Sequence, residues 1–309
     1  MNLMKTKLYA ACLIAGGLSA LTGTVQAFTI QFDYSYDGGF FADAQRKSLL
    51  ESAGSYFESR INDDLNAITS TAGPAGNNFK AIFNRPDTGA ELTLNRYSVA
   101  ADTIVVFAGG RNISALGLGG PGGYSFSSSP ADQVFIDNAT TRGESGPTSG
   151  PTATDFAPWG GAITFDSNSS WYFDDNPITD EIFSGFDFYS VALHEIAHVL
   201  GFGTVDSWNN QVSGGSFIGD NASSLFGGPV PLADLGHWQQ ALTSTIDGSG
   251  SQEAAMDPNI APGQRKRFTD LDLAALADIG WEVSAVPLPA AAYLFGAALL
   301  AMVGVGRHR

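Results

Sequence analysis

The sequence predicts an α+β fold with one twisted, mixed β-sheet. Two observations lead to this prediction. Apolar residues recur first at strand spacing, then at helix spacing, then in several strand-length runs, and finally at helix spacing again. In addition, no Pro-rich or Ser-rich linker divides the central segment 28–285, whose length fits one large domain. This order of elements favours a sheet that is covered by a small number of helices.

The first part of the central segment contains a strand, a helix and a second strand. Residues 28–34 alternate apolar and polar side chains, as expected for a half-buried strand. Asp43 can cap a following helix, because its carboxylate can accept hydrogen bonds from the first free backbone N–H groups. The apolar residues of that helix, at helical spacing, are Leu49, Leu50, Ala53, Phe57 and Ile61. Residues 103–107 are continuously apolar, which predicts a central strand.

The second part contains two more strand-length runs and two helices. The runs are residues 134–136 and 162–165. We expect a helix from about Asp187 to Leu200, where Gly201 would end it. The last helix is expected from about Asp270 to Asp278.

A stretch rich in Gly, Ser, Pro and Thr, residues 110–153, predicts long loops around a few short strands. Within it, the run Gly117–Gly123 has a composition typical of phosphate-binding loops. It lacks the Lys-Ser/Thr pair of a P-loop and does not clearly open a helix. We therefore expect this run to be a surface loop.

The composition excludes several classes of protein. The chain has 15 Lys and Arg residues against 31 Asp and Glu residues, a formal net charge of −16. This charge argues against nucleic-acid binding, because that affinity depends on neutralising phosphates. A hydrophobic fraction of 44% is enough to bury a core. The single cysteine, Cys12, excludes an intramolecular disulfide framework and a cysteine zinc cluster.

Both ends of the chain have patterns typical of targeting segments. Residues 1–27 predict a secretory signal peptide, with two lysines before an apolar run and Val25-Gln26-Ala27 as a small-residue cleavage site. Residues 286–309 begin with Val-Pro-Leu-Pro, continue with an apolar run and end in Arg-His-Arg. This layout resembles a PEP-CTERM sorting signal, and a plain tail anchor is the alternative.

The resemblance to PEP-CTERM signals implies a route through the cell. Such signals are processed by an exosortase-type enzyme in Gram-negative bacteria. We therefore expect export through the inner membrane and membrane attachment through the C-terminal segment before processing. The final location would be the cell surface or the extracellular space.

The central segment contains the motif His194-Glu195-Ile196-Ala197-His198 on an expected helix. Residues four apart lie on the same face of a helix, so both imidazoles can reach one Zn²⁺ ion. Glu195 lies beside this position and can accept a proton from the water that the metal activates. The central segment has one other histidine, His237, and catalytic zinc sites commonly use three protein ligands. A hydrogen-bonded histidine pair without metal is the alternative interpretation.

The motif resembles that of the metzincin metallopeptidases, in which it continues to a glycine matched here by Gly201. The usual position of the third metzincin ligand falls on Thr204, which is a poor replacement for histidine. In the leishmanolysin-like branch an insertion follows the glycine, and the third histidine comes later, often before a tryptophan. His237-Trp238 matches that pattern, so the resemblance implies His237 as the third ligand. Asp206 is the alternative ligand.

The same resemblance implies further features of the fold. Residues 253–258 look like the metzincin Met-turn region, which would place Met256 beneath the metal as packing support. The fold would be a metzincin-like catalytic domain over residues 28–285, with a smaller, mainly helical and loop C-terminal subdomain. An upstream strand would pair with substrate backbone, and residues 122–128 and 133–137 are the candidates.

Taken with the motif, the resemblance predicts a secreted zinc-dependent endopeptidase that cuts protein or peptide substrates, with Glu195 as general base. The alternative is a non-catalytic surface or extracellular-matrix protein with a structural or degenerate zinc site. Similar peptidases often carry structural Ca²⁺, for which Asp166, Asp174 and Asp175 are candidates. Solvated surface acids are the simpler interpretation of these three residues.

Overall fold

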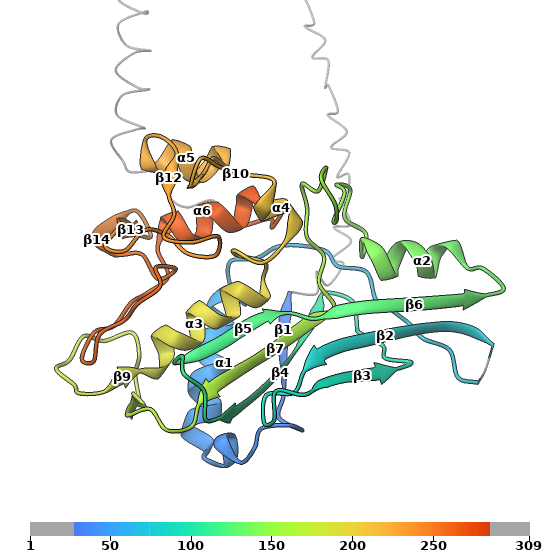
Figure 1. The fold of residues 1–309 in the computed structure, drawn as a ribbon, viewed down its shortest axis with the longest axis horizontal. Helices are drawn as coiled ribbons and strands as arrows, with labels where there is room; N and C mark the ends of the chain where they lie inside the picture. Colours follow the sequence, from blue (N-terminus) through green and yellow to red (C-terminus); the bar gives the residue numbers. More distant parts are fainter. Residues whose placement is uncertain (1–27, 74, 285–309) are drawn as a thin grey trace, which may run out of the picture.

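The computed structural model describes residues 28–73 and 75–284, and it has the α+β fold expected from the sequence (Figure 1). The expected signal peptide at 1–27 and the expected sorting segment at 286–309 lie outside the described residues. Within the described part of the chain, no helix is long and apolar enough to cross a membrane.

A four-stranded mixed sheet in the order β1-β4-β7-β5 forms the centre of the fold (Figure 1). Its strands are β1 (Thr29–Asp33), β4 (Thr103–Arg111), β7 (Gly160–Asp166) and β5 (Gly117–Pro121). The first three run parallel, whereas β5 runs antiparallel to β7 and forms an edge of the sheet. The strands expected at 28–34, 103–107 and 162–165 are therefore confirmed, and the continuously apolar one lies in the interior of the sheet.

Strand β4 separates two hydrophobic cores. Ile104, Val106 and Ala108 belong to the core beneath the helices, whereas Val105 and Phe107 belong to a second core on the opposite face. Successive side chains of a strand point to opposite faces, so a strand that is buried on both faces must be apolar at every position.

Helices α1 (Ala44–Glu58) and α3 (Phe188–Val199) pack in the first of these cores. α1 begins where the sequence predicts, because the Asp43 carboxylate accepts a hydrogen bond of 2.8 Å from the Gln45 backbone N–H. α3 begins after Asp187, whose side chain accepts from the Ser190 backbone N–H. It ends before Gly201, which has a φ of 99° that a residue with a Cβ rarely adopts.

A second sheet, in the order β3-β2-β6, contributes to the core on the other face of β4. Its strands are β2 (Gly76–Asn84), β3 (Glu91–Asn95) and β6 (Gly123–Ser129), and helix α2 (Gln133–Thr140) follows. The prediction of a strand at 134–136 is wrong, because this run lies in α2. Asp132 caps the helix, and Phe135 and Ala139 bury one of its faces. Three apolar residues fit either periodicity, so tertiary contacts decide between helix and strand.

The run Gly117–Gly123 is also different from the expectation of a surface loop. It forms β5 and leads directly into β6. From Gly117 to Pro121 it pairs with β7. Gly117, Gly119 and Gly120 thus belong to the central sheet, in the strand that packs beside α3.

The residues after α3 form a smaller, mainly helical and loop region, which lies on the other side of α3 from the sheet in Figure 1. Its elements are α4 (Asp206–Asn209), β10 (Val212–Ser213), β11 (Ser216–Phe217), α5 (Asp220–Phe226), β12 (Val230–Pro231), β13 (Thr243–Ile246), β14 (Ser249–Glu253) and α6 (Asp270–Asp278). The remaining short elements are the 3-10 helix η1 (Phe40–Ala42), β8 (Trp171–Tyr172) and β9 (Phe186–Asp187). α6 has the expected bounds and begins with a capping box made by Thr269 and Asp272.

Several carboxyl groups gather where the last described residues pack beside the end of α1. Asp63 is 2% exposed, and its Oδ2 atom accepts a hydrogen bond from the Glu282 backbone N–H. Glu144 and Asp155 share a hydrogen bond and interact electrostatically with Asp63. Burial and these neighbouring carboxylates raise the pKa of Asp63 to about 7 and that of Glu144 to about 7.

We predict that Asp63 makes the fold less stable as the pH rises from about 4 to about 7. A carboxyl group whose pKa is raised on folding binds more protons in the native state, so its stability contribution is present at low pH and lost as the pH rises through the folded pKa. Asp63→Asn keeps an acceptor for the Glu282 N–H and cannot ionise. Urea denaturation should find this variant about 2 kcal/mol more stable than the parent at pH 8 and equally stable near pH 4.

The matched control is Asp64→Asn, which changes the exposed neighbouring carboxyl. This variant should keep the pH dependence of the parent protein. The explanation is wrong if Asp63→Asn also keeps it.

Candidate metal centre and active-site cleft

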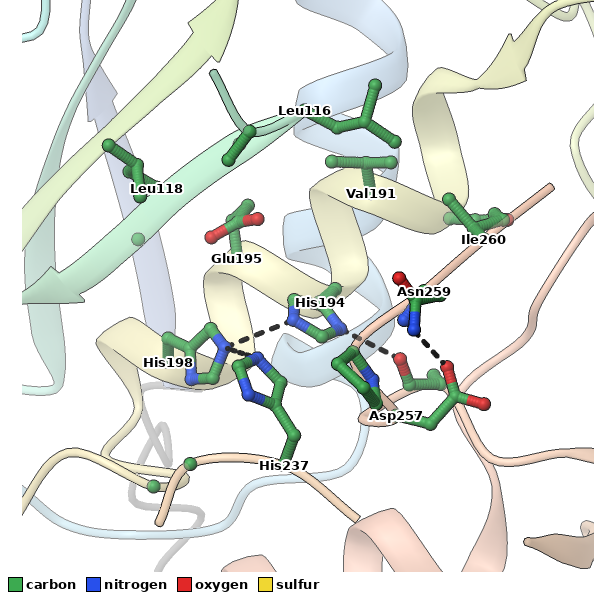
Figure 2. A pocket seen from close by; sticks show the side chains of 18 of the residues that line it. Leu116, Leu118, Val191, His194, Glu195, His198, His237, Asp257, Asn259 and Ile260 are labelled. Atoms are coloured by element: carbon green, nitrogen blue, oxygen red, sulfur yellow. Dashed lines mark hydrogen bonds between the residues drawn. The ribbon is translucent and has the colours of Figure 1, made fainter. Parts of the chain in front are cut away.

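Helix α3 carries two of the three candidate ligands. His194 and His198 lie four residues apart, so their rings share one face of the helix and their Nε2 atoms are 3.1 Å apart (Figure 2). The start of the helix is fixed by Asp187, which caps the first turn and pairs with Arg265 at 3.0 Å. The helix therefore presents both imidazoles from a rigid support.

The third histidine comes from a loop in the C-terminal region. The Nε2 atom of His237 lies 3.2 Å from that of His198. Each of the three histidines offers one nitrogen, and these atoms all lie within 4.8 Å of one another. Among the described residues they are the one group of His, Cys, Asp or Glu side chains arranged to hold a metal ion.

Each ring has a hydrogen-bond acceptor at its other nitrogen. The partners of the Nδ1 atoms, each at 2.8 Å, are the Ala255 carbonyl oxygen for His194, the Phe202 carbonyl oxygen for His198 and the Asp234 carboxylate for His237. A carbonyl oxygen cannot donate, so Nδ1 carries the proton in His194 and His198. In the neutral rings, the Nε2 lone pairs then point toward a common position.

This arrangement fits a metal ion. Lone pairs that face one another repel unless an electron-pair acceptor lies between them. Burial lowers the pKa of His194 well below its usual value and that of His198 to about 4, so protons do not fill this role at neutral pH. A tetrahedral Zn²⁺ with bonds of about 2.0–2.1 Å separates its ligand atoms by about 3.3 Å, close to the 3.1 and 3.2 Å between the Nε2 atom of His198 and those of His194 and His237.

Glu195 lies between the histidines and strand β5 (Figure 2). Its residue is 5% exposed, and burial raises the pKa of its carboxyl group to about 8. The backbone N–H of Gly119 opposes this shift, because it stabilises the charged carboxylate. The carboxyl group can therefore exchange a proton near neutral pH.

A cleft of about 1060 Å³ opens above these residues. Residues 114–119, which include the start of β5, form one wall, and α3 contributes His194, His198 and Glu195. Residues 257–260 form another wall together with Lys266. Apolar side chains around the cleft include Leu116, Val191 and Ile260 (Figure 2).

The structure places β5 along the cleft, and neither of the two segments expected to bind substrate lines it. Residues 123–129 form β6 in the second sheet, and residues 133–140 form α2. The cleft is lined by residues 114–119 of this part of the chain. The glycine-rich composition of β5 hid its strand character from sequence reasoning.

Asp206 is not part of the histidine group. Its side chain accepts a hydrogen bond of 2.6 Å from the Gly150 backbone N–H. Thr204, at the usual metzincin ligand position, lines the cleft and donates its hydroxyl to the His198 carbonyl oxygen at 3.0 Å. Of the two alternatives for the third ligand, the structure brings His237 to the other histidines.

Asp272 is a supporting residue that sequence reasoning missed. It is fully buried, and its carboxylate accepts hydrogen bonds from the backbone N–H groups of Ala255 and Met256 and from the indole N–H of Trp238. The Met256 carbonyl oxygen in turn accepts from the Trp238 backbone N–H at 3.0 Å. One carboxylate thus fixes both the turn that contacts His194 and the residue next to His237.

One feature of the sequence could have identified Asp272: it follows Thr269 by three residues, a spacing typical of a capping box. Met256 is fully buried within this turn. Its role as packing support beneath a metal stays a prediction.

The three acids considered for Ca²⁺ contact protein groups and do not form a ligand group. Asp166 accepts from the Ile113 backbone N–H and the Ser169 hydroxyl. Asp174 pairs with Arg265, and Asp175 accepts from the Gln45 side chain. The calcium hypothesis therefore finds no support at these residues.

Comparison with known families gives one match, between residues 136–209 and the matrixin family model. Searches of the curated proteins and of the solved structures found no match. The matched segment contains β7, α3 and the complete HExxH motif, and it ends before His237. It supports a zinc metallopeptidase of the metzincin type. The case for the third histidine rests on its position beside the other two.

We predict that Asp234→Ala lowers zinc affinity about 10-fold, because a carboxylate on Nδ1 orients a ligating imidazole and raises its basicity. Competition with a chromogenic chelator would measure the Zn²⁺ dissociation constant. The matched control is Asp206→Ala, which should bind zinc as tightly as the parent protein. A larger loss of affinity in Asp206→Ala than in Asp234→Ala would contradict the choice of His237.

Proposed function

We propose that the protein is a zinc-dependent endopeptidase. The observation that carries this proposal is a buried glutamate, Glu195, which lies in a cleft directly beside three converging imidazole Nε2 atoms. The matrixin match over the same helix supports it.

His194, His198 and His237 would hold the metal. When bound there, Zn²⁺ supplies Lewis acidity toward the scissile carbonyl and makes a water molecule more acidic. A structural zinc site is normally closed by four protein ligands. In the described part of the chain the group consists of three histidines beside an open cleft, which favours catalysis over the structural or degenerate site of the alternative hypothesis.

Glu195 acts as general base and then as general acid. Its carboxylate accepts a proton from the attacking water and delivers it to the leaving amine. A pKa of about 8, raised by burial, makes the carboxylate a stronger proton acceptor than an exposed glutamate. A bound metal ion would shift this pKa downward, because positive charge favours the carboxylate.

Substrate binds as an extended peptide along β5. In the central sheet this strand pairs on one side with β7, and no other strand of residues 28–73 and 75–284 lies beyond it. An extended peptide can add to such an edge through main-chain hydrogen bonds, and neighbouring pockets then select side chains. Leu116, Val191 and Ile260 favour an apolar substrate side chain beside the metal.

We also propose that the enzyme acts outside the inner membrane. This proposal rests on the patterns of residues 1–27 and 286–309 and on a central domain without cysteine. Mass spectrometry of the exported protein would show the two processed ends. A protein that retains Met1 in the mature fraction would contradict it.

We predict that Glu195→Gln abolishes cleavage while zinc is retained. The amide has nearly the shape of the carboxylate and cannot take a proton, so kcat/KM should fall at least 100-fold. The measurement is cleavage of a peptide library by purified residues 28–285, with zinc content determined in parallel.

The matched control is Glu91→Gln, which makes the same change on the exposed strand β3. It should cleave at the parent rate. Full activity of Glu195→Gln would disprove the general-base role, and a parent protein that binds zinc but cuts no peptide would favour the non-catalytic alternative.

A further inference from the structure

Strand β5 contains three glycines, although their backbone conformations do not require glycine. Gly117, Gly119 and Gly120 all have backbone conformations that ordinary residues adopt, since none is among the positive-φ glycines of the described chain. Glycine weakens a strand because it loses more conformational entropy on folding and has no side chain to pack. A different requirement must therefore explain the glycines at these positions.

That requirement is the space between β5 and α3. A Cβ atom on Gly117 would overlap the Oε1 atom of Glu195 and lie 2.6 Å from its Cγ and 2.7 Å from its Cδ. A Cβ atom on Gly119 would overlap the carbonyl oxygen of Glu195 and lie 2.9 Å from its Cα. Real Cβ atoms essentially never come within 3.0 Å of a neighbouring heavy atom. Gly120 differs, because a Cβ atom there would meet nothing within 4 Å.

Both close approaches are to the same residue of α3. Gly117 faces the end of the Glu195 side chain, and Gly119 faces its backbone. The Gly119 backbone N–H also stabilises the charged carboxylate. Figure 2 shows Glu195 between β5 and the histidines, and it also labels Leu116 and Leu118, which precede and follow Gly117 in the sequence.

We propose that Gly117 and Gly119 are positioning residues that hold the Glu195 carboxylate in its working place. Gly119 lets the strand touch the helix closely enough for its N–H to reach the carboxylate. Gly117 leaves the space that the carboxylate occupies. This inference rests on the proposed function, because it assigns the two glycines to the general base of that reaction.

The two glycines should respond differently to substitution. The Cβ of Gly117→Ala meets the end of a flexible side chain, so the fold can accept it by turning the carboxylate away. The Cβ of Gly119→Ala meets helix backbone, which cannot move without separating β5 from α3. Gly117→Ala is therefore the cleaner probe, and Gly123→Ala is its matched control, because Gly123 lies on β6 outside the cleft and a Cβ atom there would meet nothing nearer than 3.9 Å.

The first experiment measures kcat and KM for a peptide that the parent protein cuts. We expect kcat of Gly117→Ala to fall at least 10-fold, with KM within twofold of the parent value and with unchanged zinc content and melting temperature. Gly123→Ala should match the parent protein in all four quantities. Equal kcat values for the two variants would overturn the proposal, and so would a rise in KM without a fall in kcat.

A double-mutant cycle with Glu195→Asp tests whether Gly117 acts through the glutamate. The aspartate carboxylate is one methylene shorter and lies farther from position 117. Adding Gly117→Ala to Glu195→Asp should therefore cost less in kcat than adding it to the parent protein. Additive losses would overturn the proposal.

A readout without catalysis separates this inference from the proposed function. The ¹³C resonance of the Glu195 carboxyl carbon, assigned by its loss in Glu195→Gln, should move in Gly117→Ala and stay in place in Gly123→Ala. A resonance that does not move in Gly117→Ala would overturn the positioning role. If the parent protein cuts no peptide, the proposed function fails by itself and this spectrum still decides the role of the glycines.

Discussion

The candidate metal centre depends on three imidazole rings that face one another, with the Nε2 atom of His198 3.1 Å from that of His194 and 3.2 Å from that of His237. Such an arrangement is unfavourable for neutral rings, because the lone pairs repel, and burial makes protonated rings costly. The surrounding structure therefore has to impose it. It does so with hydrogen-bond acceptors on the Nδ1 atoms, which come from the turn after α3, from the turn at Ala255 and from Asp234.

Carboxylates that accept from backbone N–H groups take the place of regular secondary structure in the C-terminal region. Asp272 joins the turn at Ala255 to Trp238, and Asp278 accepts the backbone N–H groups of Asn221 and Ala222 at the start of α5. A carboxylate has several acceptor positions, so one side chain can satisfy two or three backbone donors that no ladder pairs. Part of the large acidic excess of this chain is thus structural.

The edge strand and the active-site helix lie so close together that side chains between them are excluded at two positions. This closeness explains why β5, whose glycines have a low strand propensity, lies next to Glu195. Sheet pairing with β7 compensates for the poor propensity, because the backbone hydrogen bonds of β5 do not depend on its side chains. The low strand propensity of glycine conflicts here with the close packing of β5 against α3, and such conflicts are common at functional sites.

The sequence by itself determined the elements with a long or well-capped pattern. Asp43, Asp187 and Thr269 mark helix starts because their side chains bond to backbone N–H groups a few residues away, and the β4 run is apolar at every position because it is buried on both faces. The HExxH spacing likewise placed two histidines on one helical face. Interactions of this kind are local in the chain, so a linear pattern contains them.

Only the tertiary structure decided the features that join distant segments. It assigned 134–136 to a helix, because three apolar residues fit either period and the partners of Phe135 lie elsewhere in the chain. It brought His237 to His198 across 39 residues and left Asp206 on a loop contact. It also placed the glycine-rich run in strand β5 beside Glu195. The sequence does not reveal this, because glycine is required there by the close approach of helix α3.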